Sequence, residues 1–158
     1  MKIKEGNLID KELIFDLVSQ AQKEGIKKFV VGAVIERVKN HCLLLKRAQD
    51  DFMGGLMELP SGTVDESEDL LEALFREVKE ETGLAITKIV SYLGFFDYLS
   101  SSGKKTRQFS FKVLTTKDAV CLSKEHSLFM DVLIHSAEFQ NLNISPETKK
   151  VILTAYQK

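Results

Sequence analysis

The stretch GTVDESEDLLEALFREVKEETGL, residues 62–84, constrains the fold more than any other part of this 158-residue chain. Apolar side chains recur in it at i, i+3, i+4 and i+7: Leu71, Leu74, Phe75, Val78. This spacing predicts a helix with one face packed against a core. Acidic residues normally favour the first turn of a helix, where the macrodipole is positive. Here three glutamates crowd toward the last turn instead: Glu77, Glu80, Glu81.

These three glutamates share one arc of the helix, because each residue advances by about 100°. Like charges four residues apart, as at Glu77 and Glu81, destabilise a helix by about 0.2–0.5 kcal/mol and raise each other's pKa. A divalent cation such as Mg²⁺ would neutralise them, since it binds one or two carboxylates together with water and substrate phosphates. The alternative is a solvated acidic face, partly screened by Arg76 and Lys79. Spacing alone leaves both interpretations open.

The complete string resembles the Nudix box. In that motif Gly, Glu, Arg-Glu, an apolar residue, Glu-Glu, Gly and a final apolar residue occupy fixed offsets. This chain fills every such position, with Gly62, then Glu68 after five residues, then REVKEETGL after seven more. The match is far more specific than a lone glycine motif. The resemblance implies an α/β fold of the Nudix type, an α/β/α sandwich with a mixed sheet, in which the box forms a loop, a helix and a loop.

The resemblance also implies a chemistry. Nudix hydrolases cut a diphosphate linkage, usually in a nucleoside diphosphate derivative, by water attack on phosphorus with bound Mg²⁺ or Mn²⁺. Carried over residue by residue, Glu77 and Glu81 are the best metal ligands. Glu80 is a ligand directly or through water, and Gly62 contributes its backbone carbonyl. Arg76 is assigned to orienting a glutamate, not to contacting substrate.

Other box residues are given structural roles. Glu72 and Glu80 lie four residues to either side of Arg76 and are expected to form ion pairs with it. Glu68 lies near the helix N-terminus, where its charge is favourable, so we favour a structural role for it. Gly83 is expected to end the helix in the left-handed conformation.

Outside the box, LSKEHSLF places Glu125 and His126 in a predicted loop. Many Nudix enzymes carry a further acidic ligand or general base on such a loop, so Glu125 is a catalytic candidate, with a solvated loop glutamate as the alternative. Glu77 competes for the role of base. His126 has a pKa suited to proton transfer, although a lone histidine is more often structural.

The substrate is less constrained. Phe95, Phe96 or Tyr98 could stack on a base, although aromatic residues in a strand usually belong to the core. Arg47 and Arg107 could meet phosphate or a base edge. The downstream proline of ADP-ribose-type enzymes and the SQPWPFPxS string of NADH-type enzymes are absent, which disfavours both classes without selecting another. Our hypothesis for the substrate is a nucleoside triphosphate or a related small nucleotide. The competing hypotheses are a non-catalytic Nudix-fold nucleotide-binding module and a purely structural acidic helix.

Composition supports one enzyme domain spanning residues 1–158. A net charge of −1 lacks the basic surface that nucleic acids require. No apolar run approaches the roughly 20 residues of a membrane span, and the N-terminus lacks a signal core. We therefore expect a cytoplasmic protein that binds a small nucleotide but neither nucleic acid nor membrane, with a homodimer left open. Cys42 and Cys121 are expected to be buried, reduced thiols.

The remaining pattern alternates strands and helices. A helix is expected over residues 10–24, within an N-terminal helical extension of residues 1–25, with Asp10 as N-cap. A loop is expected over residues 49–62, and a closing helix follows Ser145 and Pro146. Strands are expected over KFVVGAVIERV, HCLLLKRA, ITKIVSYLGFFDYL, KTRQFSFKVL and FMDVLIH.

Overall fold

The computed structural model describes residues 9–50 and 54–157. Its elements follow the chain as α1 (Lys11–Lys23), β1 (Lys28–Ile35), β2 (His41–Arg47), β3 (Met57–Glu58), β4 (Ser61–Thr63), α2 (Leu70–Thr82), β5 (Ile86–Leu99), β6 (Lys105–Thr115), β7 (His126–Leu133), α3 (Ala137–Asn141) and α4 (Pro146–Ala155). The expected N-terminal helix is present and is capped by the Asp10 side chain, which accepts the Leu13 N–H at 3.0 Å. Residues 51–53 of the expected loop lie outside the described residues.

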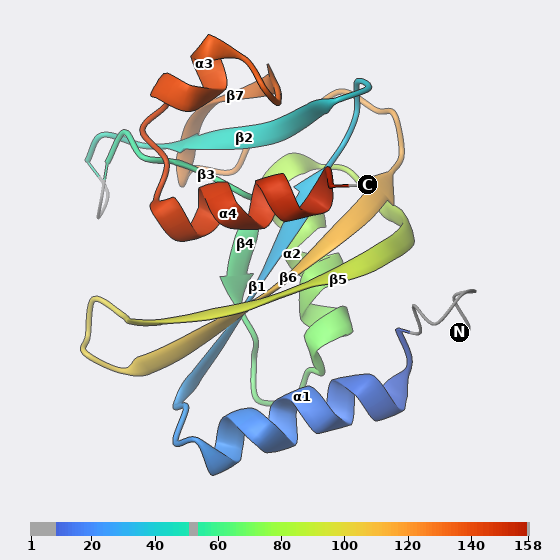
Figure 1. Cartoon of the computed structure of the whole chain (residues 1–158), viewed down its shortest axis with the longest axis vertical. Helices are drawn as coiled ribbons and strands as arrows, with labels where there is room; N and C mark the ends of the chain where they lie inside the picture. The colour runs from blue at the N-terminus through green and yellow to red at the C-terminus, as the bar shows by residue number, and fades with distance from the viewer. Residues whose placement is uncertain (1–8, 51–53, 158) are drawn as a thin grey trace.

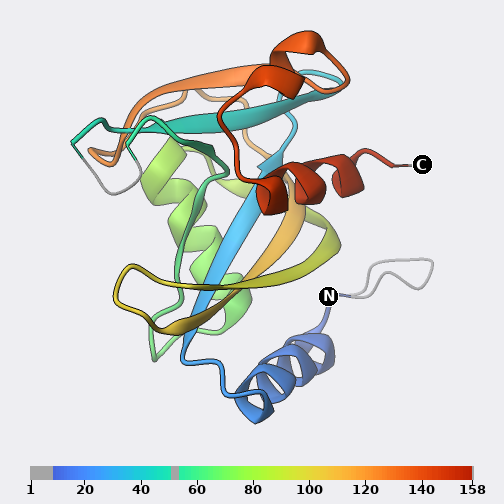
Figure 2. The ribbon, with the colours of Figure 1, turned by 60° about the vertical axis from the view of Figure 1, so that its left-hand side comes forward.

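The described strands form two sheets. The larger has the order β4-β1-β6-β5, in which β1 and β6 run parallel and the other neighbours run antiparallel. The smaller sheet is antiparallel, with the order β3-β2-β7. Figure 1 shows α4 in front of the strands, α2 behind them and α1 below. The turned view shows the same layers (Figure 2). The expected mixed sheet between helices is confirmed.

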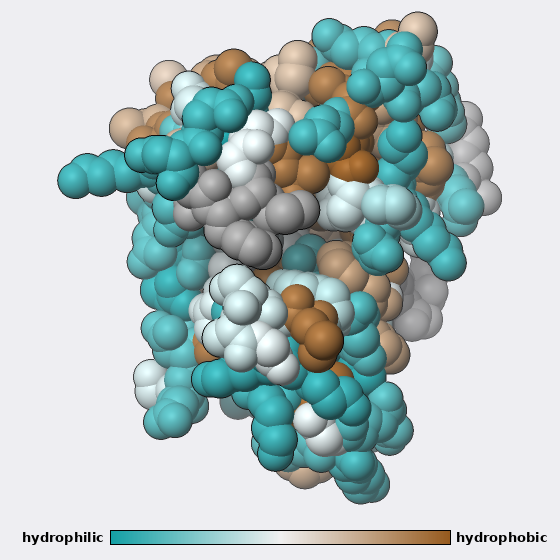
Figure 3. Space-filling model, turned by 90° about the vertical axis from the view of Figure 1, so that its left-hand side faces the viewer, coloured by the Kyte–Doolittle hydropathy of each residue, from teal (hydrophilic) through white to brown (hydrophobic). Residues whose placement is uncertain are grey.

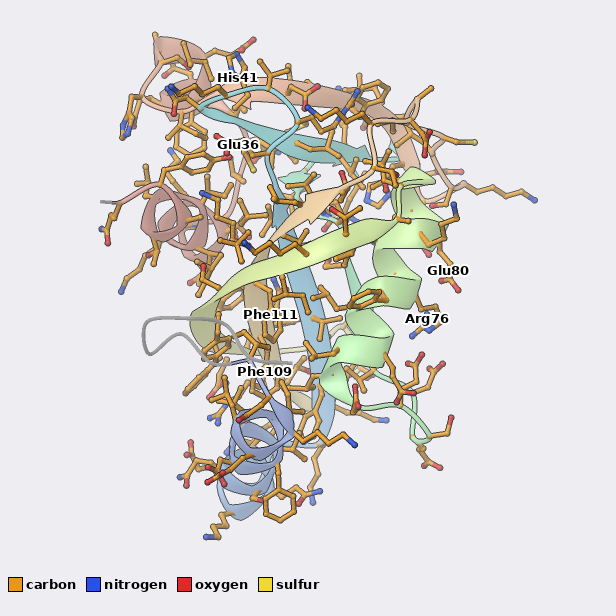
Figure 4. All side chains as sticks on the ribbon, turned by 90° about the vertical axis from the view of Figure 1, so that its right-hand side faces the viewer. Glu36, His41, Arg76, Glu80, Phe109 and Phe111 are labelled. Carbon is orange, nitrogen blue, oxygen red and sulfur yellow. The ribbon has the colours of Figure 1, made fainter. Side chains whose placement is uncertain are left out.

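Two apolar clusters lie on opposite sides of the strands, and β1 contributes to both. Val31 and Ala33 pack in the cluster formed with α1 and α2, whereas Val34 packs in the one formed with α3 and α4. Because both faces of β1 are covered, its sequence is a nearly continuous apolar run. Phe109 and Phe111 project from β6 into the first cluster (Figure 4).

Helix α2 ends at Gly83 as the sequence predicts, but the set of side chains that it buries is not the expected one. Asp69 and Glu72 form a reciprocal capping box, and Gly83 ends the helix with a φ of 76°. Phe75 is exposed and Leu71 only partly buried, so the expected apolar face is partly wrong. The buried set is Leu70, Ala73, Leu74, Val78, Glu81 and Thr82. The buried face thus includes Glu81.

The expected turn between the first two strands is present: β1 and β2 flank Asn40, which has a φ of 63°, and they belong to different sheets. Three other local expectations differ from the structure. The loop of residues 49–62 contains β3 and enters β4, because short strands give too few residues for a visible alternation. β7 begins at His126, three residues before FMDVLIH, and α3 was not expected. Cys42 is buried as expected, whereas Cys121 is exposed.

Candidate active site

Strand β4 lays the box loop against the C-terminal half of α2. Gly62 pairs with Val31 of β1 and faces the Glu77 carboxylate so closely that a Cβ at this position would lie 2.0 Å from Glu77 Cδ. Any side chain here would displace that carboxylate. Glycine at this position therefore lets the Glu77 carboxylate approach β4 closely, while the role of its carbonyl as a metal ligand stays a prediction.

Glu81 is the buried acid of the site, with 4% of its surface exposed. Its Oε1 accepts the backbone N–H of Ser61 at 2.9 Å, which ties the end of α2 to β4. Burial raises the pKa of Glu81 to about 9, helped by the charges of Glu77, Glu125 and Glu58 and opposed by the Ser61 hydrogen bond. A carboxylate in such a place would be stabilised by a cation.

Glu77 and Glu80 occupy different environments. Burial raises the pKa of Glu77, and the neighbouring Arg76 opposes this shift. The Glu80 side chain is 56% exposed. Arg76 and Glu80 project from the outer side of α2, away from the strands (Figure 4). Of the three predicted ligands, Glu77 and Glu81 thus lie inward and Glu80 outward.

Arg76 holds several of the box residues together. Its Nε and Nη2 donate to both oxygens of Glu68, at 2.6 and 2.8 Å, and Nη2 also donates to the Thr63 carbonyl at 3.0 Å. Nη1 donates to Glu77 at 2.8 Å and to Glu80 at 3.2 Å. These contacts are the geometry expected of a residue that orients a glutamate.

Two of the acids near Arg76, Glu68 and Glu72, are held in different ways. The Arg76 guanidinium and the Asp65 N–H hold the pKa of Glu68 down at about 2. The expected ion pair between Arg76 and Glu72 is wrong, because the Glu72 carboxylate accepts the Asp69 N–H in the capping box instead.

Glu125 is exposed and lies on the loop before β7. Its backbone carbonyl accepts the Ala48 N–H at 3.0 Å, and its charge contributes to the raised pKa of both Glu77 and Glu81. The structure therefore brings this loop residue toward the box carboxylates.

A group that the sequence did not single out adjoins this loop. Glu58 of β3 accepts hydrogen bonds from Arg47 Nη1 at 3.1 and 3.3 Å, and it lies 2.7 Å from Nε2 of the buried His126. One signal could have found Glu58. It is an acid between two buried apolar residues, Met57 and Leu59, directly before the box loop.

A cleft of about 660 Å³ adjoins the box loop, β3 and the loop of Glu125. Glu81 lines this cleft, whereas Glu77 and Glu80 are not among its lining residues. Figure 3 shows a hollow on this side of the molecule, between the lower half and the upper half. The acidic lining is Glu58, Glu81, Glu125 and Glu147; the rest includes Arg47, Gly62, Phe96, Tyr98, Gln108 and Thr148.

The expectation that the β5 aromatic residues are core is wrong for two of them. Phe95 and Tyr98 are 48% and 40% exposed, because β5 is an edge strand with irregular register. Arg107 does not line the cleft: it is buried and ion-paired with Asp97 and Glu24, both at 2.7 Å.

The family model of the NUDIX domain matches residues 27–150. The chain belongs to the Nudix family. The ADP-ribose pyrophosphatase of Methanocaldococcus jannaschii is 40% identical over 83 residues, which cover 48% of this chain and 47% of that protein. The 8-oxo-dGTP diphosphatase of Buchnera aphidicola is 30% identical over 112 residues, 71% of this chain and 81% of that protein.

The fold of this chain is also similar to that of a solved MutT protein. The crystal structure of the MutT protein from Methanosarcina mazei Go1 has a TM-score of 0.69 and 27% identity, and the match covers 84% of this chain and 94% of that one. The chain spans about half the length of the M. jannaschii relative.

The Nudix family implies a divalent cation at the box, and the donor chemistry of this site fits one. Within residues 9–50 and 54–157, no three His, Cys, Asp or Glu side chains already converge as a metal-binding group. Arg76 holds one oxygen of Glu77, and the Ser61 N–H holds one of Glu81. Yet these are hard oxygen donors whose charges repel one another, and a cation of the Mg²⁺ type would offset that repulsion. No helix of the described chain is long and apolar enough to cross a membrane.

Proposed function

We propose that this protein is a metal-dependent pyrophosphohydrolase that cleaves a diphosphate linkage in a nucleoside diphosphate derivative. One observation carries the proposal: the buried Glu81 lines the cleft beside Gly62, and the absence of a side chain at Gly62 leaves space for the Glu77 carboxylate. A buried acid with a raised pKa, beside further acids in a cleft, is a candidate functional site. Gly62, Glu77 and Glu81 are also the residues that occupy fixed positions of the Nudix box.

The carboxylates Glu77 and Glu81, with the outward-facing Glu80 as a ligand directly or through water, would hold Mg²⁺ or Mn²⁺. When bound, the cation neutralises charge on phosphate oxygens and lowers the pKa of water. Arg76 fixes the Glu77 carboxylate from the outer side and keeps its rotamer. Glu81 must lose its proton before it can act as a ligand, so its raised pKa ties metal binding to pH.

Glu125 is proposed as the proton acceptor for the attacking water, with Glu77 as the competing candidate. Glu77 is held by Arg76 and would use its remaining oxygen on the cation, whereas Glu125 approaches from the loop side of the cleft. Replacing a base should lower the rate with metal binding kept, whereas replacing a ligand should lower both.

We propose a nucleoside triphosphate or a related small nucleotide as substrate. The cleft volume suits a mononucleotide, within the range of small-ligand sites. The names of the relatives include both an ADP-ribose pyrophosphatase and an 8-oxo-dGTP diphosphatase. One domain, a cytoplasmic location and a homodimer stay predictions.

The proposal is tested by incubating the protein with Mg²⁺ and a panel of nucleoside triphosphates, nucleoside diphosphates and ADP-ribose, and measuring release of phosphate, diphosphate and nucleoside monophosphate. Hydrolysis that is lost with a chelator and in Glu81→Gln supports it. Tight nucleotide binding by calorimetry without turnover would instead favour a non-catalytic binding module.

A further inference from the structure

The floor of the cleft carries an aromatic pair and a carboxamide that the proposed metal site does not use. Phe96 of β5 is the Cα partner of Gln108 on β6, and Tyr98 follows two residues later on the same face. Side chains directly opposite one another on an antiparallel pair lie about 4.5–5.5 Å apart at Cβ. All three residues line the cleft.

The aromatic pair presents ring surface to the cleft. The Phe96 and Tyr98 centroids are 5.9 Å apart with an interplanar angle of 33°, so the two rings form a tilted but nearly continuous platform. Tyr98 is 40% exposed although it is a large aromatic residue. Stacking of a nucleobase on such rings is worth about 1–3 kcal/mol and tolerates every base.

Gln108 is placed as a polar group at the edge of this platform. It is 8% exposed, and its carboxamide has one hydrogen bond within the described structure, a long one of 3.4 Å from Nε2 to Ser110 Oγ. A bond of that length satisfies the amide poorly. Gly32 makes room for it, because a Cβ there would lie 2.5 Å from Gln108 Nε2. The amide therefore keeps a donor and an acceptor available for a ligand.

We propose that Gln108 binds the hydrogen-bonding edge of a nucleobase that stacks on Phe96 and Tyr98. This inference rests on the proposed function, because the diphosphate must then extend toward Glu81 at the other part of the same cleft. An amide pairs with a base edge that offers one acceptor beside one donor, as adenine does. The substrate class is thus a nucleotide with a recognised base, not a sugar diphosphate alone.

The test compares Gln108→Ala and the nearly isosteric Gln108→Glu with wild type, on the best nucleoside triphosphate and on base-free ribose 5-triphosphate. Loss of a bidentate contact of about 1–3 kcal/mol lowers kcat/KM roughly 5- to 150-fold. We expect this loss for Gln108→Ala on the nucleotide only, and a changed order of preferred bases for Gln108→Glu. Gln140→Ala removes an exposed carboxamide on α3 and is the control.

Equal losses on both substrates, or unchanged nucleotide kinetics in both variants, would overturn the assignment. Calorimetry with a non-hydrolysable α,β-methylene nucleotide separates it from the proposed function. Nucleotide binding that weakens in Gln108→Ala, in a protein without turnover, supports the base site while the hydrolase proposal fails. Nucleotide hydrolysis that is equal in wild type and in both Gln108 variants supports the hydrolase proposal and overturns the base site.

Discussion

At the scale of single residues, the carboxylates of α2 work against the stability of the metal-free protein. Glu81→Gln keeps the volume and the Ser61 contact but removes an acid that must take up a proton to be buried, and Glu77→Gln relieves repulsion beside it. We expect hydrolysis to fall at least about a hundredfold in either variant, because ligand losses exceed the 10–100-fold typical of supporting residues. Melting without metal should occur at an equal or higher temperature. Glu66→Gln, an exposed acid of the box loop, is the control, and wild-type turnover in the two ligand variants would remove the metal-site assignment.

Glu81 also predicts how the free energy of unfolding depends on pH. The pKa of Glu81 is raised from 4.5 to about 9 in the folded protein. Between these values the unfolded chain has lost a proton that the folded protein keeps, so the free energy of unfolding decreases as the pH rises. Urea titrations of the metal-free protein should show this decrease across about pH 5 to 9, and Glu81→Gln should flatten it. A wild-type stability that rises with pH across this range would contradict the assignment.

Arg76 donates hydrogen bonds to four residues and gives a third residue-scale prediction. Arg76→Ala should lower kcat by about a hundredfold, because an error near 1 Å in the placement of a catalytic group costs about that much. Metal binding, measured by Mn²⁺ titration, should persist, since Arg76 donates to carboxylates and does not itself bind cations. Arg76→Lys should recover little, because lysine cannot form the bidentate contact with Glu68. If neither kcat nor Mn²⁺ affinity changes, Arg76 is only a surface residue.

At the scale of elements, the smaller sheet positions the loop of Glu125. Arg47 of β2 is the Cα partner of His126 on β7, and both contact Glu58 of β3. The Glu125 carbonyl is bound by the Ala48 N–H. Three strands therefore fix His126, the residue after Glu125, and the Ala48 contact fixes the backbone of Glu125 itself. His126 is inferred to act as a positioning residue.

The prediction is that His126→Phe, which keeps a buried ring but removes the contact with Glu58, lowers kcat by about 10–100-fold. In a Glu125→Gln background the same change should cost much less, because residues acting through one group are non-additive. His135→Asn, at an exposed turn with a φ of 60° that asparagine tolerates, is the control. Equal losses in both backgrounds would mean a merely structural histidine. Unchanged kinetics in Glu125→Gln alone would take Glu125 out of the site.

Helix α2, its end at Gly83 and the crowding of Glu77 and Glu81 follow from local spacing, so they could be predicted. The capping box of Asp69 and Glu72 was not predicted, because Glu72 was assigned to an ion pair with Arg76. The contact between Glu58 and His126 joins residues 68 apart, and only the pairing of β2 with both β3 and β7 creates it. Burial of Glu81 likewise depends on the rotation of α2 against β4, which an apolar pattern fixes only to within part of a turn.

At the scale of the whole molecule, α1 lies outside the matched family region but belongs to the main core. Residues Ile14 and Ala21 are buried in the cluster that α2 shares. A buried arginine reinforces this packing: Arg107 of β6 contacts Glu24 after α1 and Asp97 of β5, and its Cζ lies 3.9 Å from the centroid of Phe95. The contacts of Arg107 thus join the end of α1 to the β5–β6 hairpin, which also lines the cleft.

The last prediction concerns this junction. Asp97→Ala leaves the Nε of buried Arg107 without its acceptor, which should lower the free energy of unfolding by roughly 1–3 kcal/mol. Arg107 lowers the pKa of Asp97, so this contribution is present above the ordinary carboxyl pKa and is lost as the pH falls through the lowered value. Urea titrations at pH 7 should therefore separate Asp97→Ala from wild type, and titrations near pH 3 should separate them less. Asp16→Ala, an exposed acid on α1, is the matched control. A difference that grew toward low pH would show that the Arg107 junction does not stabilise the fold through the Asp97 carboxylate.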